Sequence, residues 1–314
     1  MQNYNVNLQE QLEVYLAAGH SQEEAAKAIG VTGGLLSSYR KSKYTGNISN
    51  VERKLEEFFR LLAAEQERAD KLDGQRAAEG YVPTSVSESV YNTIEYARME
   101  KGIAIAHGDA GIGKTMAASH YVAENPNACV YIQASPLISS LSAFLAELAR
   151  AMRIPARRNK LDTATAIQDK FAGTGRVLII DEAQHLKYLT LETIRTWGDP
   201  DPVSGRPGIG IVLMGNSDVY DRMLGRQEAR FAQLFSRTRM QCSYSTRDIQ
   251  LSDVQMLFPA LAKKDKELGW MLSVCQSKWG CRGAVNIYNN AVNNDDTSYK
   301  GLLAMSRAMG VGLL

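Results

Sequence analysis

The chain has 314 residues, of which 45% are apolar and 22% charged, so it can bury the cores of about two ordinary globular domains. Its formal net charge is only +2, which excludes nucleic-acid binding by overall charge and leaves only local basic clusters for that task. The four cysteines lack zinc-type pairing, no apolar stretch reaches membrane-spanning length, and no signal-peptide pattern is present. We therefore expect a cytoplasmic protein with reduced thiols, no structural metal and no membrane partner.

Residues 1–64 predict an N-terminal helical domain. Ser21 offers an N-cap with two glutamates in the first helical turn, Gly30 ends that helix, and a second short helix opens at Thr32. Leu35 and Leu36 should point inward. The residues expected on the outer face are Tyr39, Arg40, Lys41 and Lys43.

This order of helix, glycine turn and basic helix is the plan of a helix-turn-helix module, in which Arg40, Lys41 and Lys43 would contact DNA. A plain helical hairpin with a solvated basic face is the alternative. A longer amphipathic helix follows from Ile48, and residues 65–89, rich in charge, Gly and Ser, predict a linker.

The most specific motif is Gly-Asp-Ala-Gly-Ile-Gly-Lys-Thr at residues 108–115. It lies between an apolar run at 103–106 and a helix-forming sequence that starts at Met116, which is the context of a phosphate-binding loop. Its glycines let backbone N–H groups curl round phosphates at a helix N-terminus, Lys114 would contact the β- and γ-phosphates, and the Thr115 hydroxyl would ligate Mg²⁺. The residues expected to bind the nucleotide are Gly108, Asp109, Ala110, Gly111, Ile112, Gly113, Lys114 and Thr115.

Beyond this loop the sequence predicts a short strand at 128–133, a helix at 137–152 and a helix at 163–171. Arg157, Arg158 and Lys160 fall in the connection between the two helices, where they form a second candidate DNA contact. The alternative is a solvated charge run on the surface.

An apolar run at 177–180 ends in Asp181 and Glu182, as expected for a buried parallel strand that delivers carboxylates to a nucleotide site. Asp181 would hold Mg²⁺ through water, and Glu182 would orient and deprotonate the attacking water. Another buried strand, at 208–215, ends in Asn216, which would lie between the γ-phosphate and Glu182 or simply occupy a turn.

Residues 231–240 predict an apolar helix that ends near Arg237. Presented at a helix end, Arg237 could reach a nucleotide bound by a neighbouring subunit, with Arg239 as its substitute, or it could only pair with the helix dipole. Residues 246–314 show helical periodicity without strong strands and predict a small helical lid. The expected fold is therefore an α/β parallel sheet with helices on both faces, over residues 90–245, followed by this lid.

The loop at 108–115, Val-Leu-Ile-Ile-Asp-Glu-Ala-Gln-His-Leu, Val-Leu-Met-Gly-Asn and Leu-Phe-Ser-Arg together resemble the Walker A, Walker B, sensor 1 and arginine-finger stretches of AAA+ ATPases. The order of helix-turn-helix, linker and AAA+ core, with the run Gly-Ile-Gly-Ile-Val-Leu-Met-Gly-Asn-Ser-Asp-Val-Tyr-Asp-Arg-Met, resembles the phage Mu B-type DNA transposition proteins over nearly the whole chain.

The resemblance implies ATP and Mg²⁺ as cofactors and slow hydrolysis that DNA and a partner stimulate. It implies helical oligomers on double-stranded target DNA, bound with little sequence preference, which is delivered to a transposase to stimulate strand transfer. It also implies the cytoplasm of the host cell as the location if the gene belongs to a phage.

One position departs from the AAA+ pattern. Asn286 stands where the sensor 2 arginine is expected, and Arg282 lies one helical turn earlier. An ATP-responsive, site-specific helix-turn-helix regulator remains an alternative function. A P-loop kinase is disfavoured by the Asp181–Glu182 pair and by Arg237.

Overall fold

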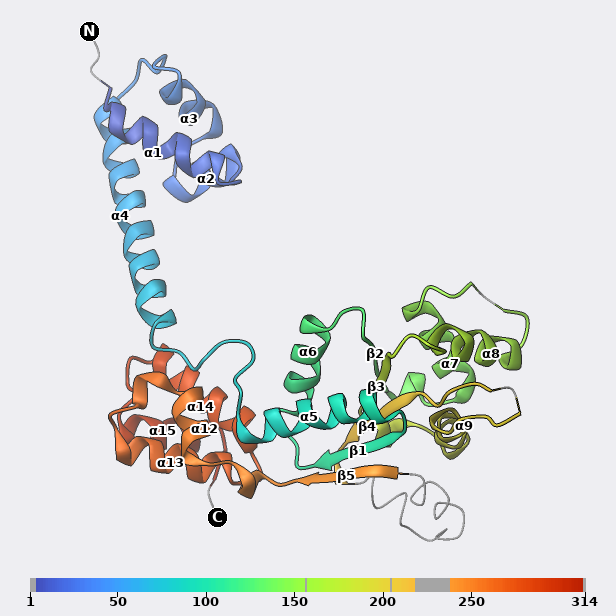
Figure 1. Cartoon of the computed structure of the whole chain (residues 1–314). Helices are drawn as coiled ribbons and strands as arrows, with labels where there is room; N and C mark the ends of the chain where they lie inside the picture. The colour runs from blue at the N-terminus through green and yellow to red at the C-terminus, as the bar shows by residue number, and fades with distance from the viewer. Residues whose placement is uncertain (1–3, 156, 204, 218–237, 313–314) are drawn as a thin grey trace. The chain divides into compact units, whose positions relative to one another are not determined.

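Figure 1 shows the computed structural model of the chain, which describes residues 4–155, 157–203, 205–217 and 238–312. Contacts divide the chain into two compact units, Met1–Gln75 and Arg76–Leu314. Among the described residues, no helix has both the length and the apolar character needed to cross a bilayer.

The first unit consists of helices α1 (Val6–Ala17), α2 (Gln22–Ile29), α3 (Gly33–Arg40) and α4 (Ile48–Asp73). Ser21 and Glu24 form a reciprocal capping box at the start of α2, and Gly30 ends that helix in the left-handed conformation, so the expected helix–turn–helix order is present. Leu36 is buried, as expected. Tyr39 is not on the outer face: it is fully buried, and its hydroxyl donates to Glu52 in α4 at 3.1 Å. A tyrosine can fill the core because its hydroxyl reaches a partner there.

Residues 65–89, for which the sequence predicts a linker, contain the end of α4 and the first turn of α5 (Ser85–Glu100). The segment between these helices is bonded to the C-terminal helices of the second unit. The Ala78 N–H donates to the Leu257 carbonyl at 2.8 Å, and the Ala77 N–H donates to the Asn289 side chain at 3.0 Å.

The second unit is built on a five-stranded parallel sheet in the order β2-β3-β4-β1-β5. The strands are β1 (Ile103–Gly108), β2 (Cys129–Gln133), β3 (Val177–Asp181), β4 (Gly210–Gly215) and β5 (Thr238–Tyr244). Strands β1, β3 and β4 are buried along their whole length, which explains their mainly apolar sequences.

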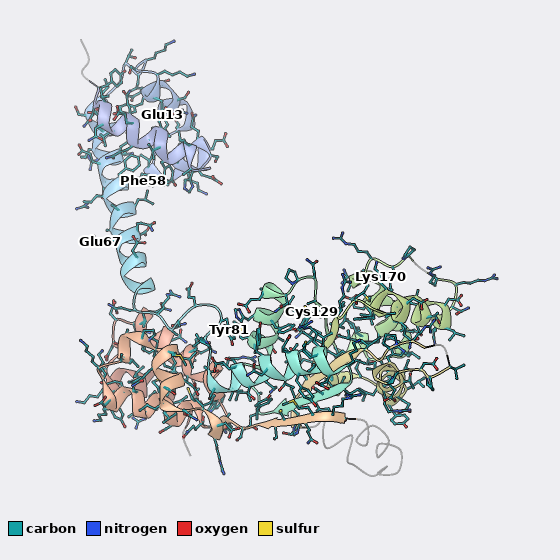
Figure 2. The ribbon with its side chains drawn as sticks, in the orientation of Figure 1. Glu13, Phe58, Glu67, Tyr81, Cys129 and Lys170 are labelled. Atoms are coloured by element: carbon teal, nitrogen blue, oxygen red, sulfur yellow. The ribbon has the colours of Figure 1, made fainter. Side chains whose placement is uncertain are left out.

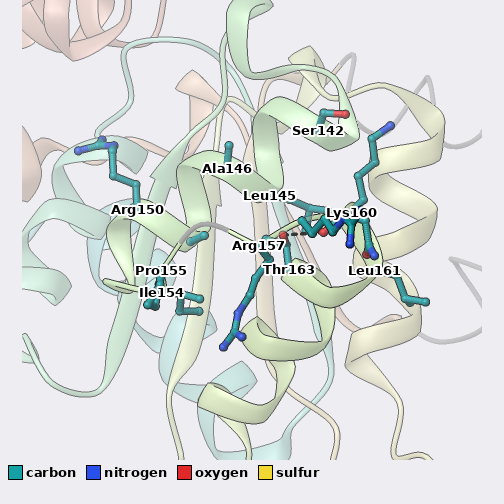
Figure 3. Close-up of a pocket in the computed structure, with 13 residues that line it drawn as sticks. Ser142, Leu145, Ala146, Arg150, Ile154, Pro155, Arg157, Lys160, Leu161 and Thr163 are labelled. Carbon is teal, nitrogen blue, oxygen red and sulfur yellow. Dashed lines mark hydrogen bonds between the residues drawn. The ribbon is translucent and has the colours of Figure 1, made fainter.

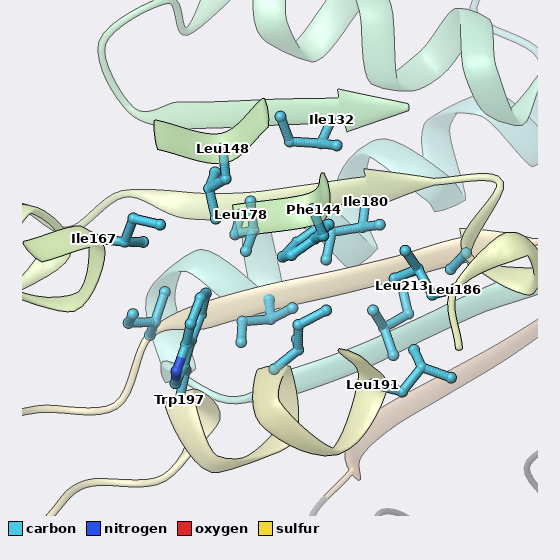
Figure 4. Close-up of a cluster of buried hydrophobic side chains, with 14 of the residues drawn as sticks. Ile132, Phe144, Leu148, Ile167, Leu178, Ile180, Leu186, Leu191, Trp197 and Leu213 are labelled. Carbon is cyan, nitrogen blue, oxygen red and sulfur yellow. The ribbon is translucent and has the colours of Figure 1, made fainter. Parts of the chain in front are cut away.

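Helices cover both faces of this sheet (Figure 1). On one face lie α7 (Leu141–Ala151), α8 (Lys160–Phe171) and α9 (Tyr188–Gly198), whose apolar side chains pack with those of the strands into the main core (Figure 4). Helix α5 lies against β1 and β4, with α6 (Lys114–Glu124) beside it. Gly210 permits this close approach, since a Cβ there would overlap the carbonyl oxygen of Ala97 in α5.

The lid is helical, as the sequence predicts. It contains α12 (Leu251–Leu257), α13 (Asp265–Cys275), α14 (Gly280–Asn293) and α15 (Tyr299–Ala308). Short 3₁₀ turns occur at Pro136–Ile138, Ala183–His185, Thr246–Asp248 and Pro259–Leu261. The α/β P-loop fold with a C-terminal helical lid is thus confirmed.

The apolar helix predicted within residues 231–240, with its end near Arg237, lies outside the described residues up to that end. From Thr238 onward the chain is a strand, because β5 pairs with β1 at the edge of the sheet. Its side chains alternate between half-buried and exposed up to Tyr244, which is the pattern of a strand with one covered face.

Candidate nucleotide site

The eight residues expected to bind the nucleotide comprise the last residue of β1, the loop that follows it and the first two residues of α6. They lie at the carboxyl edge of the sheet, where ligands of such folds bind. Gly113 caps α6 with a φ of 103°, a conformation that other residues avoid. Gly108 lies so close to β5 that a Cβ would overlap the Tyr244 carbonyl. Helix α6 begins directly at the loop, and the N–H groups and dipole at a helix N-terminus favour an anion.

Lys114 is the buried cation of this loop. Its ammonium donates to the carbonyl oxygens of Gly108 at 2.9 Å and Asp109 at 2.6 Å, and only 9% of the residue is exposed. Burial lowers the pKa of Lys114, while the carboxylates of Asp181 and Glu182 oppose that shift. A phosphate beside the ammonium would supply the counter-charge that burial makes favourable.

Thr115 and Asp181 meet as the metal assignment requires. The Thr115 hydroxyl donates to Asp181 Oδ2 at 2.8 Å, although 66 residues separate the two. Asp181 is 1% exposed and lies at the end of β3, where the Glu182 N–H donates to its Oδ1 at 2.8 Å. A carboxylate and a hydroxyl in contact form the hard oxygen set that suits Mg²⁺ with water and phosphate oxygens. Bound there, Mg²⁺ would neutralise charge on the β- and γ-phosphates.

Tyr131 is a residue of this corner that the sequence did not reveal. It lies on β2, and its hydroxyl donates to the same Asp181 oxygen at 3.1 Å. Burial raises the pKa of Tyr131 well above its usual range, and Asp181 raises it further, so the hydroxyl remains a donor at every physiological pH. Two hydroxyls, from Tyr131 and Thr115, therefore orient Asp181.

Glu182 follows β3 directly in the left-handed conformation, with φ 54° and ψ 35°. Left-handed backbone is uncommon for a glutamate and is found at sites where a side chain must be aimed. The Gln184 amide donates to its Oε2 and so restrains the carboxylate. Asn216 follows β4, the strand between β3 and β1, so it lies between the carboxylates and the phosphate loop at the same edge.

Arg237 lies outside the described residues. Arg239 belongs to β5, where its side chain lies against Gly102 and its guanidinium is 3.8 Å from Glu100. This position is at the amino end of β1, whereas the phosphate loop is at the carboxyl end.

The lid reaches the phosphate loop through the start of α14. The Arg282 N–H donates to the Gly111 carbonyl at 3.1 Å, and Gly280 packs against Ala110 so closely that a Cβ would lie 2.9 Å from its carbonyl oxygen. The charge of Arg282 contributes to the lowered pKa of Lys114. Asn286 is exposed one helical turn further on. Arg282 is thus a lid cation that lies close to the loop.

The basic residues of the core line a pocket of about 980 Å³ between α7 and α8 (Figure 3). Arg157 and Arg158 precede α8, and Lys160 is its first residue rather than part of the connection. All three are exposed, and apolar residues including Leu145 and Ile154 also line the pocket. The charged ends of Arg157 and Lys160 extend in different directions (Figure 3).

The N-terminal basic residues differ from one another. Arg40 forms a two-pronged ion pair with Glu13, both bonds 2.7 Å long, and also donates to Gln22 at 2.9 Å (Figure 2 labels Glu13). Its guanidinium is therefore engaged within the unit. Lys41 and Lys43 are exposed.

Comparisons with known proteins agree with this geometry. Residues 97–223 match the family model described as an AAA domain. The chain is 32% identical over 273 residues to the Mu-like prophage FluMu DNA transposition protein B of Haemophilus influenzae, covering 85% of this chain and 90% of that protein. It is 29% identical to the ATP-dependent target DNA activator B of Escherichia phage Mu, covering 86% and 81%. The crystal structure of Cdc6p from Pyrobaculum aerophilum has the same fold, with a TM-score of 0.54 at 16% identity over 74% of this chain and 69% of that one.

Proposed function

The chain belongs to the phage Mu B-type DNA transposition proteins and is an AAA+ ATPase of DNA transposition. We propose that it binds target DNA only when ATP is bound. The observation that carries this proposal is the meeting of Lys114, Thr115, Asp181 and Glu182 at one edge of the sheet. ATP with Mg²⁺ binds at the phosphate loop, and Glu182 deprotonates the attacking water while Asn216 helps to position it. The protein works in the cytoplasm of the cell that carries the gene.

The protein forms a helical oligomer on double-stranded DNA, presents that DNA to a transposase and stimulates strand transfer. A protein that must accept nearly any target sequence should hold phosphates rather than read base edges. Exposed basic residues repeated once per subunit along the duplex would do this without a large net charge. In the oligomer, Arg237 completes the nucleotide site of a neighbouring subunit and contributes to hydrolysis there.

The core supplies the main grip on DNA through Arg157, Arg158 and Lys160. The exposure of all three residues supports this assignment. In the N-terminal module Lys41 and Lys43 add affinity for DNA, whereas the ion pair with Glu13 keeps Arg40 from contacting DNA. Two lost phosphate contacts should flatten the slope of log affinity against log salt by about 1.8, at about 0.9 per contact.

The salt dependence of DNA affinity tests this grip. For Arg157→Ala with Arg158→Ala, the loss of affinity between 50 and 200 mM salt should be about 12-fold smaller than in the native protein. Lys263→Ala with Lys264→Ala removes the same charge from exposed positions of the lid and should leave the slope near its native value. Equal slopes for both double variants would refute the proposal that the core holds DNA through these residues.

The proposed function is tested by footprinting on a long duplex of arbitrary sequence, with and without ATP. We expect broad protection that requires ATP and spreads as protein is added. A short footprint at one fixed sequence would instead identify a site-specific regulator that reads an operator through α3. Broad protection that is equal without ATP would refute the nucleotide switch.

A further inference from the structure

The second residue of the phosphate loop, Asp109, is bonded to the start of the lid. Its Oδ2 accepts the Thr246 N–H at 2.7 Å and lies 3.2 Å from the hydroxyls of both Ser245 and Thr246. Ser245 and Thr246 follow β5 directly, at the point where the sheet gives way to the lid. The Thr246 N–H and the two hydroxyls keep the pKa of Asp109 below its usual value, so the carboxylate is charged at neutral pH.

Thr246 can bond in two ways. Its hydroxyl lies 3.2 Å from the Asp109 carboxylate and 3.1 Å from the carbonyl of Gln276, which caps α13. A hydroxyl has one proton, so it can donate to the loop or to the lid helix at any moment, but not to both. Gln276 is itself tied to the strand-to-lid connection, since its amide donates to the Ile249 carbonyl at 2.9 Å.

On the nucleotide side, Asp109 is bonded to Lys114. Its ammonium donates to the backbone carbonyl of Asp109 at 2.6 Å, so a phosphate that attracts the ammonium competes with that bond. The peptide of Asp109 is then released on one side, while the same residue still holds Thr246 through its side chain. Movement of the Lys114 ammonium toward a phosphate thus changes whether the Thr246 hydroxyl donates to Asp109 or to the Gln276 carbonyl.

We propose that Asp109 is a positioning residue that transmits nucleotide occupancy of the phosphate loop to the lid through Thr246. The proposal rests on ATP binding at this loop. Coupling between two sites requires a structural element with two arrangements whose balance the ligand alters. The two alternative bonds of the Thr246 hydroxyl, to Asp109 and to Gln276, are such an element. A second hydrogen bond, from the Arg282 N–H to the Gly111 carbonyl, joins α14 to the loop, so α14 should also respond to nucleotide binding.

The test compares Asp109→Asn with Asp253→Asn in the full chain. Asp253 is 1% exposed and caps α12, and its carboxylate accepts bonds from Ser85 and Gln250, so the same substitution there perturbs the lid without touching the loop. Two quantities are measured for each protein: ATP affinity by titration, and the hydrogen-exchange rate of the α14 amides with and without saturating ATP.

In the native protein ATP should slow exchange in α14 by about tenfold, which is within the usual range of coupling between sites. In Asp109→Asn, saturating ATP should slow α14 exchange by less than about twofold. Asp253→Asn should lower thermal stability and keep the native response to ATP. Thr246→Val, which retains the backbone N–H, removes the hydroxyl and lies outside the phosphate loop, should keep ATP affinity within about threefold of native. ATP should slow its α14 exchange by less than about twofold, as in Asp109→Asn.

A native response to saturating ATP in Asp109→Asn or in Thr246→Val overturns the proposal. Loss of ATP binding in Thr246→Val overturns it too, because the substitution would then act on the nucleotide site itself. Loss of the response in Asp253→Asn as well would reduce the effect to general lid instability and overturn it too. Failure of the native protein to bind ATP would refute the nucleotide site, and the coupling with it, as a separate result.

Discussion

Replacement of Tyr131 by Phe removes one hydroxyl from the metal corner and leaves the ring in place. The lost bond is the 3.1 Å donation to Asp181 Oδ2, beside the 2.8 Å bond from Thr115. A hydrogen bond to a charged group contributes about 1.5–3 kcal/mol. Because Asp181 keeps two other donors and Tyr131 is only half-buried, we expect the lower end, about 1.5 kcal/mol.

This energy should appear as weaker Mg²⁺ binding, since Asp181 is less firmly oriented. A loss of about 1.4 kcal/mol corresponds to a tenfold change in an equilibrium constant. The Mg²⁺ concentration at half-maximal ATP hydrolysis should therefore rise about tenfold, and direct Mn²⁺ binding in the presence of ATP should weaken equally.

Tyr121→Phe is the matched control. Its hydroxyl donates to Glu95 at 2.7 Å, between α6 and α5, so the variant loses a bond of the same kind away from the metal corner. It should lose stability and keep the native Mg²⁺ dependence. A native Mg²⁺ dependence in Tyr131→Phe would refute the role assigned to that hydroxyl.

Three further outcomes are expected. Glu182→Gln should bind ATP, hydrolyse it at least about 100-fold more slowly and accumulate on DNA, because an amide cannot accept the proton of water; hydrolysis at the native rate would exclude Glu182 as the base. Mixtures of Arg237→Ala and Lys114→Ala subunits should recover part of the ATPase activity at hybrid interfaces, and no recovery in mixtures shown to co-assemble would argue against a role across subunits. Burial raises the pKa of Tyr244 to about 12, above the value of about 10 expected when unfolded, so the urea midpoint should fall as pH rises from 10 to 12 and should fall less in Tyr244→Phe; equal losses would contradict this.

Much of the core could be predicted because its signals are local. The motif at residues 108–115 is recognised by its own spacing, and the buried strands β1, β3 and β4 each contain a short apolar run. The sequence does not predict strand β5, because its apolar positions, Met240, Cys242 and Tyr244, alternate with polar ones and follow a helical pattern without a break. The alternation itself was the signal that could have identified the strand.

The contacts that refine the site could not be predicted, because they join distant parts of the chain. Tyr131 meets Asp181 across 50 residues, and Asp109 meets Thr246 across 137. Neither pair has a spacing motif, and each depends on which strands are neighbours. The engagement of Arg40 by Glu13 is similar: the sequence shows a basic helix end, and only packing shows that one of its charges is already paired.

The most direct test of the account is the DNA affinity of the native protein and of Lys114→Ala, each measured with and without ATP on a duplex of arbitrary sequence. We predict that ATP strengthens binding by the native protein and has no effect on the variant, because Lys114 is the buried cation that a β- or γ-phosphate would neutralise. Circular dichroism of Lys114→Ala would confirm that it is folded. ATP-dependent binding by a folded Lys114→Ala protein, equal to that of the native chain, would contradict the central claim.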